Sequence, residues 1–264
     1  MKIDHPKKSL GQNFLIDKNI IDIIINAGDI KKTDTILEVG AGTGSLTEKI
    51  LTKNPKKIFA VEMDKLLTKK LYDKLKEKIV LISDDILKID EKKYSDDPMV
   101  VFGNLPYNIS TQILVKWIRY KNLNNTFKKF ILMFQKEVAE RILAETNSKN
   151  YGRLAVLSSW KLQIEKVTDV SPNSFYPVPK VKSTVLLIKP KSEHFNLKNS
   201  KNLEHITNIF FNQRRKMIKK PLNIIFKNID EISKKLNINI NDRPQNLSPL
   251  KYFEICKEYE NLDS

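Results

Sequence analysis

Hydrophobic and polar positions along the first half of the chain follow two periods, one typical of amphipathic helices and one of buried strands. Helical spacing is found at residues 17–27, 45–53, 64–76, 110–121 and 135–145. Short apolar runs typical of buried strands lie between them, at residues 35–39, 57–62, 79–83, 99–103 and 127–134. This alternation predicts an α/β fold, a doubly wound parallel sheet with helices on both faces. Ligands of such sheets bind beyond the carboxyl ends of the strands.

The pattern changes near residue 171. Pro172, Pro177 and Pro179 predict a rigid loop over residues 171–181, and residues 183–189 form one more apolar run that we expect to close the sheet. Beyond residue 190 the strand patterns stop, and short helices are predicted over 201–218, 221–227, 229–236 and 248–259. We therefore predict a sheet domain over residues 1–190 and a small helical domain over residues 191–264.

Several classes of protein are disfavoured by what the sequence lacks. Its apolar runs are too short to span a bilayer, and residues 1–14 lack the apolar stretch of a secretory signal. We therefore expect a cytoplasmic protein with no membrane partner. Cys256 has no second cysteine to pair with, and the three histidines show no metal-ligand spacing, so we expect neither a disulfide nor a metal site.

The charge balance indicates a polyanionic partner. The chain has 47 Lys and Arg against 31 Asp and Glu, a formal net charge of +16. A lysine-rich composition explains why only six of these cations are arginines, but it does not explain the excess of basic over acidic residues. Residues 211–221 hold five cations and no acid; these cations are Arg214, Arg215, Lys216, Lys219 and Lys220. A solvated helix face is the alternative, but the adjacent arginines favour contact with RNA phosphates or with the catalytic domain.

A glycine-rich turn follows the first predicted strand of the sheet. Gly40, Gly42 and Gly44 alternate at the junction between strand and helix, where glycine lets the backbone approach a ligand and the helix directs free amides toward it. A dinucleotide-binding loop would have its third glycine at position 45, which is Ser45 here. A nucleotide-type cofactor is therefore favoured, and a nicotinamide-dependent dehydrogenase is disfavoured.

Acidic residues end the next two predicted strands. Glu62 lies 18 residues beyond Gly44, where a carboxylate can accept hydrogen bonds from both hydroxyls of a ribose. Asp85 ends the third strand, where a carboxylate can accept from the amino group of an adenine. Each acid alone is more typical of a helix cap or of a solvated position, but their succession at strand ends predicts a nucleoside site.

The fourth predicted strand ends in Asn104-Leu105-Pro106-Tyr107. The amine of adenine is a poor nucleophile because its lone pair is delocalised into the ring, so an enzyme must bind it as it loses planarity. The Asn104 side-chain oxygen and the Leu105 carbonyl can accept its two N–H groups, while Pro106 fixes the turn and Tyr107 stacks on the base. The alternative, a proline turn with a capping asparagine, is weakened by the neighbouring cofactor loop.

Taken together, these motifs resemble the ribosomal RNA small-subunit adenine dimethyltransferase A family. The resemblance spans nearly the whole chain and rests on eight segments, residues 8–15, 40–44, 102–111, 135–141, 151–154, 175–183, 211–216 and 243–248. It implies a Rossmann-like, class I S-adenosylmethionine-dependent enzyme that converts two adjacent adenosines near the 3′ end of 16S rRNA to N6,N6-dimethyladenosine. Ala41 and Gln245 depart from the family pattern, and neither removes an expected cofactor contact.

The resemblance also implies functional positions. The cofactor positions are Asn13, Leu15, Gly40, Gly42, Glu62, Asp85 and Asn104, and Phe175 is implied to stack on the target base opposite Tyr107. Residues 1–190 would then be the catalytic domain and 191–264 an RNA-binding domain. We expect a monomer with a role in small-subunit biogenesis that acts on 16S rRNA within the small ribosomal subunit and not on DNA.

Related functions remain as alternatives. Erythromycin-resistance methylases share the fold and chemistry but modify 23S rRNA; Leu105, where they usually carry isoleucine, and residues 243–248 favour the small-subunit enzyme. Mitochondrial transcription factors of similar fold act mainly as binding proteins. A ribosome assembly factor for which catalysis is secondary would share the basic features without needing Asn104.

Overall fold

The computed structural model describes residues 6–7 and 11–262, which form two compact units. The first unit comprises the described residues up to Ala139 together with Gln163–Pro190. The second comprises Glu140–Leu162 and the described residues from Lys191 onward. The helical unit thus takes in residues 140–162 as well as the residues beyond 190 that the sequence assigned to it.

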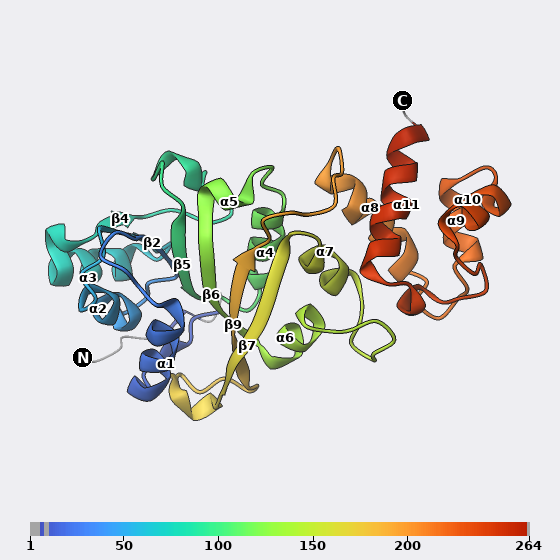
Figure 1. Cartoon of the computed structure of the whole chain (residues 1–264). Helices are drawn as coiled ribbons and strands as arrows, with labels where there is room; N and C mark the ends of the chain where they lie inside the picture. Colours follow the sequence, from blue (N-terminus) through green and yellow to red (C-terminus); the bar gives the residue numbers. More distant parts are fainter. Residues whose placement is uncertain (1–5, 8–10, 263–264) are drawn as a thin grey trace. The chain divides into compact units, whose positions relative to one another are not determined.

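A seven-stranded sheet forms the centre of the first unit (Figure 1). Its strand order is β4-β3-β2-β5-β6-β9-β7. The bounds are β2 (Thr35–Val39), β3 (Lys57–Val61), β4 (Val80–Ile82), β5 (Met99–Asn104), β6 (Phe127–Gln135), β7 (Leu162–Val170) and β9 (Ser183–Pro190). A separate two-stranded antiparallel sheet pairs β1 (Phe14–Leu15) with β8 (Phe175–Tyr176).

Helices cover both faces of the large sheet. One face packs on α1 (Lys18–Gly28), α2 (Ser45–Leu51) and α3 (Lys65–Leu75), whose apolar side chains share a core with Ile131 and Met133 of β6. On the opposite face α4 (Ser110–Ile118) places Trp117 against Phe130, with ring centroids 5.0 Å apart. The alternation of side chains along β6 therefore serves two cores, as a doubly wound α/β fold requires.

Side-chain caps fix where two of these helices begin. The Asp17 carboxylate accepts from the backbone N–H groups of Asn19 and Ile20 at the start of α1, and Asp64 accepts from Leu66 N at the start of α3. Such caps satisfy backbone donors that have no partner within the helix. The remaining short helices of this region are α5 (Leu123–Thr126) and α6 (Lys136–Ile142).

The sheet is mixed, which corrects the prediction that it is parallel throughout. β4, β3, β2, β5 and β6 are parallel to their neighbours, but β9 pairs antiparallel with β6, with Gln135 opposite Ser183. Residues 183–189 do extend the sheet as predicted. They enter it from the proline-rich loop, without the crossover helix that a parallel strand needs, so they run in the reverse direction.

The second unit is built from helices. They are α7 (Arg153–Lys161), α8 (Ser200–Phe211), α9 (Lys219–Ile225), α10 (Ile229–Leu236) and α11 (Pro249–Leu262). Phe211 of α8 stacks on Tyr252 of α11, with ring centroids 5.4 Å apart, and the buried Tyr151 hydroxyl donates to Leu247 O at 2.9 Å. The predicted helix over 201–218 ends at Phe211, so Arg214 and Arg215 lie in the turn that follows it, while Lys219 and Lys220 begin α9.

The described part of the chain holds neither a membrane-spanning helix nor a cluster of metal ligands. Within residues 6–7 and 11–262, no helix is both long enough and apolar enough to cross a membrane. In the same part of the chain, no three His, Cys, Asp or Glu side chains are grouped so that they could hold a metal ion.

A buried carboxyl in β2 predicts how stability depends on pH. Glu38 is 1% exposed, and burial raises its pKa to about 8, with a smaller contribution from the charge of Glu62. The folded chain therefore binds a proton that the unfolded chain releases near pH 4.5, so stability falls as the pH rises from about 5 to 8, by up to ~1.4 kcal/mol per pH unit.

We expect Glu38→Gln to flatten this part of the pH profile. Thermal unfolding followed by circular dichroism at half-unit pH steps measures it, with Glu48→Gln on the exposed face of α2 as the control. A pH profile of Glu38→Gln that parallels the parent protein's would show that Glu38 does not titrate in this range.

Candidate functional site

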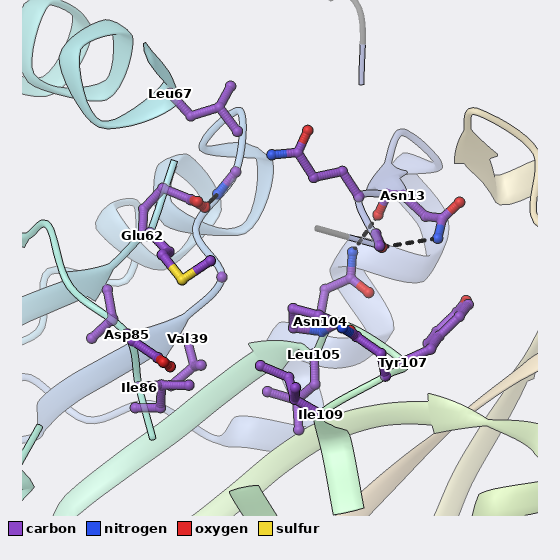
Figure 2. A pocket seen from close by; sticks show the side chains of 18 of the residues that line it. Asn13, Val39, Glu62, Leu67, Asp85, Ile86, Asn104, Leu105, Tyr107 and Ile109 are labelled. Carbon is purple, nitrogen blue, oxygen red and sulfur yellow. Dashed lines mark hydrogen bonds between the residues drawn. The ribbon is translucent and has the colours of Figure 1, made fainter. Parts of the chain in front are cut away.

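A cavity of about 210 Å³ opens at the carboxyl ends of β2, β3 and β5. Figure 2 shows Asn13, Glu62, Asp85, Asn104 and Tyr107 arranged around it. These side chains come from four separate stretches of sequence, and all of them belong to the first unit. The cavity is lined by the following residues: Gly11–Phe14, Val39, Gly40, Gly42, Val61–Met63, Leu67, Asp84–Leu87 and Asn104–Ile109.

The glycine loop between β2 and α2 forms one wall. Gly40 has φ +74°, and a Cβ built on it would lie 3.3 Å from Asn104 O. A side chain at this position would be strained and would crowd the backbone of the neighbouring strand end. Gly42, with φ +56°, also lines the cavity, and its backbone N–H donates to Glu62 Oε2 at 2.9 Å. The loop therefore brings bare backbone to the cavity.

Glu62 is held rigidly at the end of β3. Its Oε2 accepts from Gly42 N, and its Oε1 accepts from Asp64 N at 2.8 Å. Glu62 is only 8% exposed, and this burial raises the pKa of its carboxyl group above the ordinary value. The two backbone hydrogen bonds lower the pKa, but by less than burial raises it. Each oxygen keeps a lone pair that can accept from a ligand, so the carboxylate can bind two adjacent hydroxyls.

Asp85 lies in the loop after β4. Its Oδ1 accepts from Leu87 N at 2.9 Å, and its carbonyl accepts from Lys88 N at 2.8 Å, so the residue closes a tight turn. Ile86 follows it into the cavity lining and is 5% exposed. A carboxylate next to an apolar side chain suits the amino group and the flat face of a purine.

Asn104 ends β5 and faces the cavity. Its Nδ2 donates to Asn13 O at 2.8 Å, as the dashed line in Figure 2 shows. Because the amide nitrogen is engaged there, the Oδ1 atom is directed away as the acceptor. Tyr107 follows within the same turn, and its hydroxyl shares a 2.7 Å hydrogen bond with Ser183 Oγ. Burial raises the pKa of Tyr107, so the phenol stays protonated and the ring stays neutral.

Residues 11–13, directly before β1, line the cavity, and two described residues of this region make long-range contacts. Asn13 lines the cavity, and Gln12 Nε2 donates to Asp64 Oδ2 at 3.0 Å, while Lys7 Nζ donates to the other oxygen of Asp64 at 3.0 Å. The sequence analysis assigned no role to Gln12 or Asp64, because no local pattern reports a contact between residues 52 positions apart. Residues 8–10 of this motif lie outside the described residues.

Phe175 and Leu15 are not brought to the cavity. Phe175 is 1% exposed and shares the main core with Leu15, which is 3% exposed and lies opposite it across β1 and β8. Side chains alternate along a strand, so these two residues point into the core while Phe14 and Tyr176 point the other way. Phe14 lines the cavity, and Tyr176, opposite Phe14, is 47% exposed. The exposed aromatic ring of this loop is therefore Tyr176.

The five basic residues that the sequence singles out in segment 211–221 differ in their surroundings. Four of the five singled out by the sequence line a shallow surface groove together with Arg243; these are Arg215, Lys216, Lys219 and Lys220. Arg214 is instead engaged within the unit: its Nε donates to Gln245 Oε1 at 3.2 Å, and its guanidinium also donates to the carbonyls of Ser148 and Lys149. A guanidinium occupied in this way serves the fold.

Nearly the whole chain is similar to known proteins of one family. A family model described as ribosomal RNA adenine dimethylase matches residues 3–261. A protein of Pelagibacter ubique named ribosomal RNA small subunit methyltransferase A is 54% identical over 256 residues, which cover 97% of each chain. A relative of the same name from Ehrlichia canis is 42% identical over 258 residues, 96% of each chain.

Two solved structures share the fold. A dimethyladenosine transferase from Plasmodium falciparum is 27% identical, with a TM-score of 0.78, over 94% of this chain and 98% of its own. The 23S rRNA methyltransferase ErmE is 22% identical, with a TM-score of 0.69, over 96% and 100%. The likeness to ErmE concerns the fold alone. The α/β class predicted from the sequence is confirmed.

Proposed function

The chain belongs to the ribosomal RNA adenine dimethylase family, and we propose that it transfers methyl groups from S-adenosylmethionine to the N6 atoms of two adjacent adenosines near the 3′ end of 16S rRNA. The observation that carries the proposal is the position of Asn104. It ends the strand beside the nucleoside-type pocket, with its amide nitrogen bound and its oxygen free to accept.

The residues present fit S-adenosylmethionine. Gly40 and Gly42 offer bare backbone where a Cβ would meet Asn104 O or the Phe14 ring, Glu62 suits the ribose hydroxyls, and Asp85 suits the adenine amine. When bound, this cofactor supplies an electrophilic methyl group on a sulfonium, which leaves as a neutral thioether after transfer. Asn13 lies at the same cavity and completes the set.

The chain's own groups would prepare the target amine. Asn104 Oδ1 and the Leu105 carbonyl accept its N–H groups, which draws the nitrogen toward a pyramidal geometry and frees the lone pair for attack. Pro106 adds no backbone N–H at this turn, and Tyr107 offers a neutral ring for stacking. The alkylated amine is acidic, so it releases its proton to water and needs no strong base.

The adenosine must leave its stack to reach Asn104. Flipping a base costs a few kcal/mol and is easiest in a loop or at a helix end. Phosphate contacts would hold the RNA while the pocket reads the base, and the groove formed by Arg215, Lys216, Lys219, Lys220 and Arg243 supplies cations for them. The helical unit would thus act as an RNA-binding domain.

Methylation of isolated ribosomal subunits tests the proposal. The protein is incubated with labelled S-adenosylmethionine and unmethylated small subunits, with large subunits in parallel, and the products are mapped by nuclease digestion and mass spectrometry. We expect N6,N6-dimethyladenosine at two adjacent positions of small-subunit RNA only. Label in 23S rRNA would reassign the substrate, and tight binding without label would indicate an assembly factor.

The two groups of basic residues predict different effects on RNA binding. Arg215→Ala combined with Lys219→Ala is expected to weaken binding and to flatten the plot of log K against log salt, by roughly 1 for each lost phosphate contact. Filter binding to small-subunit RNA at four salt concentrations measures the slope.

Arg214→Ala serves as the matched control for this experiment. It removes one positive charge from the same segment, but its main expected effect is a loss of stability of about 1–3 kcal/mol, because Gln245 and two carbonyls lose their donor. A slope altered most by Arg214→Ala would assign the phosphate contact to Arg214 and not to the groove.

A further inference from the structure

A buried ion pair lies beneath the loop that carries Asp85. Glu91 begins a single 3₁₀ turn (Glu91–Lys93) and is fully buried, with 0% of its side chain exposed. Lys116, in the last turn of α4, places its Nζ 2.8 Å from Glu91 Oε1, and only 18% of its side chain is exposed. Neither residue lines the cavity, and the mechanism above uses neither.

Helix α4 and Tyr120, two residues beyond its end, hold the Glu91 carboxylate from several directions. Besides Lys116, Trp117 donates from Nε1 to Oε1 at 2.6 Å, and the Tyr120 hydroxyl donates to Oε2 at 2.5 Å. Three donors within five residues satisfy the buried charge, so removing water from it costs little. The result is a fixed anion that orients Lys116.

Lys116 uses its other two N–H groups on the Asp85 loop. Its Nζ donates to the carbonyls of Ile86 and Ile89, both at 2.6 Å. With Glu91 these contacts account for all three N–H groups of the ammonium. Ile86 directly follows Asp85 and lines the cavity, so the ammonium clamps the backbone one residue away from the carboxylate.

We propose that Lys116 is a positioning residue that makes the cofactor site selective for adenine, because it fixes the backbone of the Asp85 loop. The inference rests on the proposed function, in which Asp85 accepts from the adenine amine. Asp85 is held by hydrogen bonds within its own turn, and that turn is joined to the protein core through Lys116. A loop free to move by an ångström would lose a directional hydrogen bond while still presenting Ile86 to the purine face.

The inference is tested by comparing two ligands that differ at the purine 6-position. S-adenosylhomocysteine carries the amine there, whereas S-inosylhomocysteine carries an oxo group, and both can be titrated calorimetrically without RNA. Lys116→Met keeps the length and apolar stem of the side chain but removes all three donors. We expect its affinity for the adenosyl ligand to fall about tenfold or more, as for loss of a charged hydrogen bond, with little change for the inosyl ligand.

Matched variants separate positioning from general damage. Asp85→Ala defines the phenotype of a lost amine contact, and Lys116→Met should reproduce its loss of preference. Tyr120→Phe removes another donor to Glu91 while Lys116 keeps its hydrogen bonds to the carbonyls of Ile86 and Ile89, so it should lower the melting temperature and keep the preference. In methyl transfer, Lys116→Met should raise KM for the cofactor with kcat nearly unchanged.

Lys116→Met leaves the buried Glu91 without its cation, so a second variant is needed in case this protein folds poorly. Glu91→Gln with Lys116→Met removes both charges, keeps an acceptor for Trp117, and should show the same loss of preference. An equal weakening of both ligands, or a preference retained in these variants, would overturn the inference. If the unaltered protein binds neither ligand, the proposed cofactor site itself fails.

Discussion

Asn104→Ala is expected to slow methyl transfer by about 10²–10³-fold, the usual cost of removing a preorganised group that acts in the transition state. The reason is specific to the amine. Its lone pair becomes available only as the nitrogen leaves the plane of the ring, and two acceptors stabilise that geometry. The 2.8 Å hydrogen bond from Asn104 Nδ2 to Asn13 O fixes which atom of the amide faces the substrate.

Single-turnover kinetics on small subunits, with cofactor and RNA both saturating, measures this effect. Affinity for S-adenosylhomocysteine should fall less than the rate, because the pocket keeps its glycine loop and both acids. Asn108→Ala is the matched control, since Asn108 lines the same cavity on the same turn but has no proposed role at the amine. Full activity of Asn104→Ala would remove the proposed chemistry and favour a binding function.

Local signals were sufficient for the parts of the fold that are buried on both faces. The run Thr35–Val39 was predicted with the bounds that the structure shows, because all five residues are buried and glycine follows them. The helices predicted over 17–27 and 64–76 begin one residue later, because Asp17 and Asp64 cap α1 and α3. In these places neighbouring residues alone determine the structure.

Elements that depend on distant contacts were missed. Strand β7 lies at the edge of the sheet and carries Gln163, Glu165 and Lys166, so its composition shows no apolar run. Helix α8 ends at Phe211 although helical spacing continues to residue 218, and Arg214 beyond it binds the carbonyls of Ser148 and Lys149. No pattern within a short window reports such contacts.

Some residues of the candidate site could be predicted from local sequence, and others depend on distant contacts. Gly40, Glu62, Asp85 and Asn104 could be found because each ends a predicted strand, and parallel strands bring their ends together. Asn13 could not, because its contact with Asn104 joins positions 91 residues apart. The burial of Phe175 depends on the register of β8 against β1, which no motif encodes.

Glu62→Ala is expected to weaken S-adenosylhomocysteine binding by about 10²-fold or more. Hydrogen bonds from two ribose hydroxyls to a carboxylate contribute ~1.5–3 kcal/mol each, and each factor of ten in affinity corresponds to about 1.4 kcal/mol. The substitution also removes the acceptor for Gly42 N and Asp64 N, which releases the glycine loop from α3. Glu62→Gln keeps one oxygen acceptor, so its affinity for S-adenosylhomocysteine should lie between those of the parent protein and of Glu62→Ala.

Isothermal titration at several pH values distinguishes a ribose contact from a general effect of charge. Burial raises the pKa of Glu62, so this carboxylate becomes protonated at a higher pH than an ordinary glutamate and loses acceptor capacity as the solution is acidified. Affinity of the parent protein for S-adenosylhomocysteine should therefore decline on acidification, and Glu62→Gln should lose that part of the decline.

Glu48→Ala removes an acid that pairs with Lys74 outside the cavity, so it should leave both affinity and pH profile unchanged. If Glu48→Ala weakened binding as much as Glu62→Ala, the contribution of Glu62 would be one of net charge, and the ribose would have to be bound by other groups.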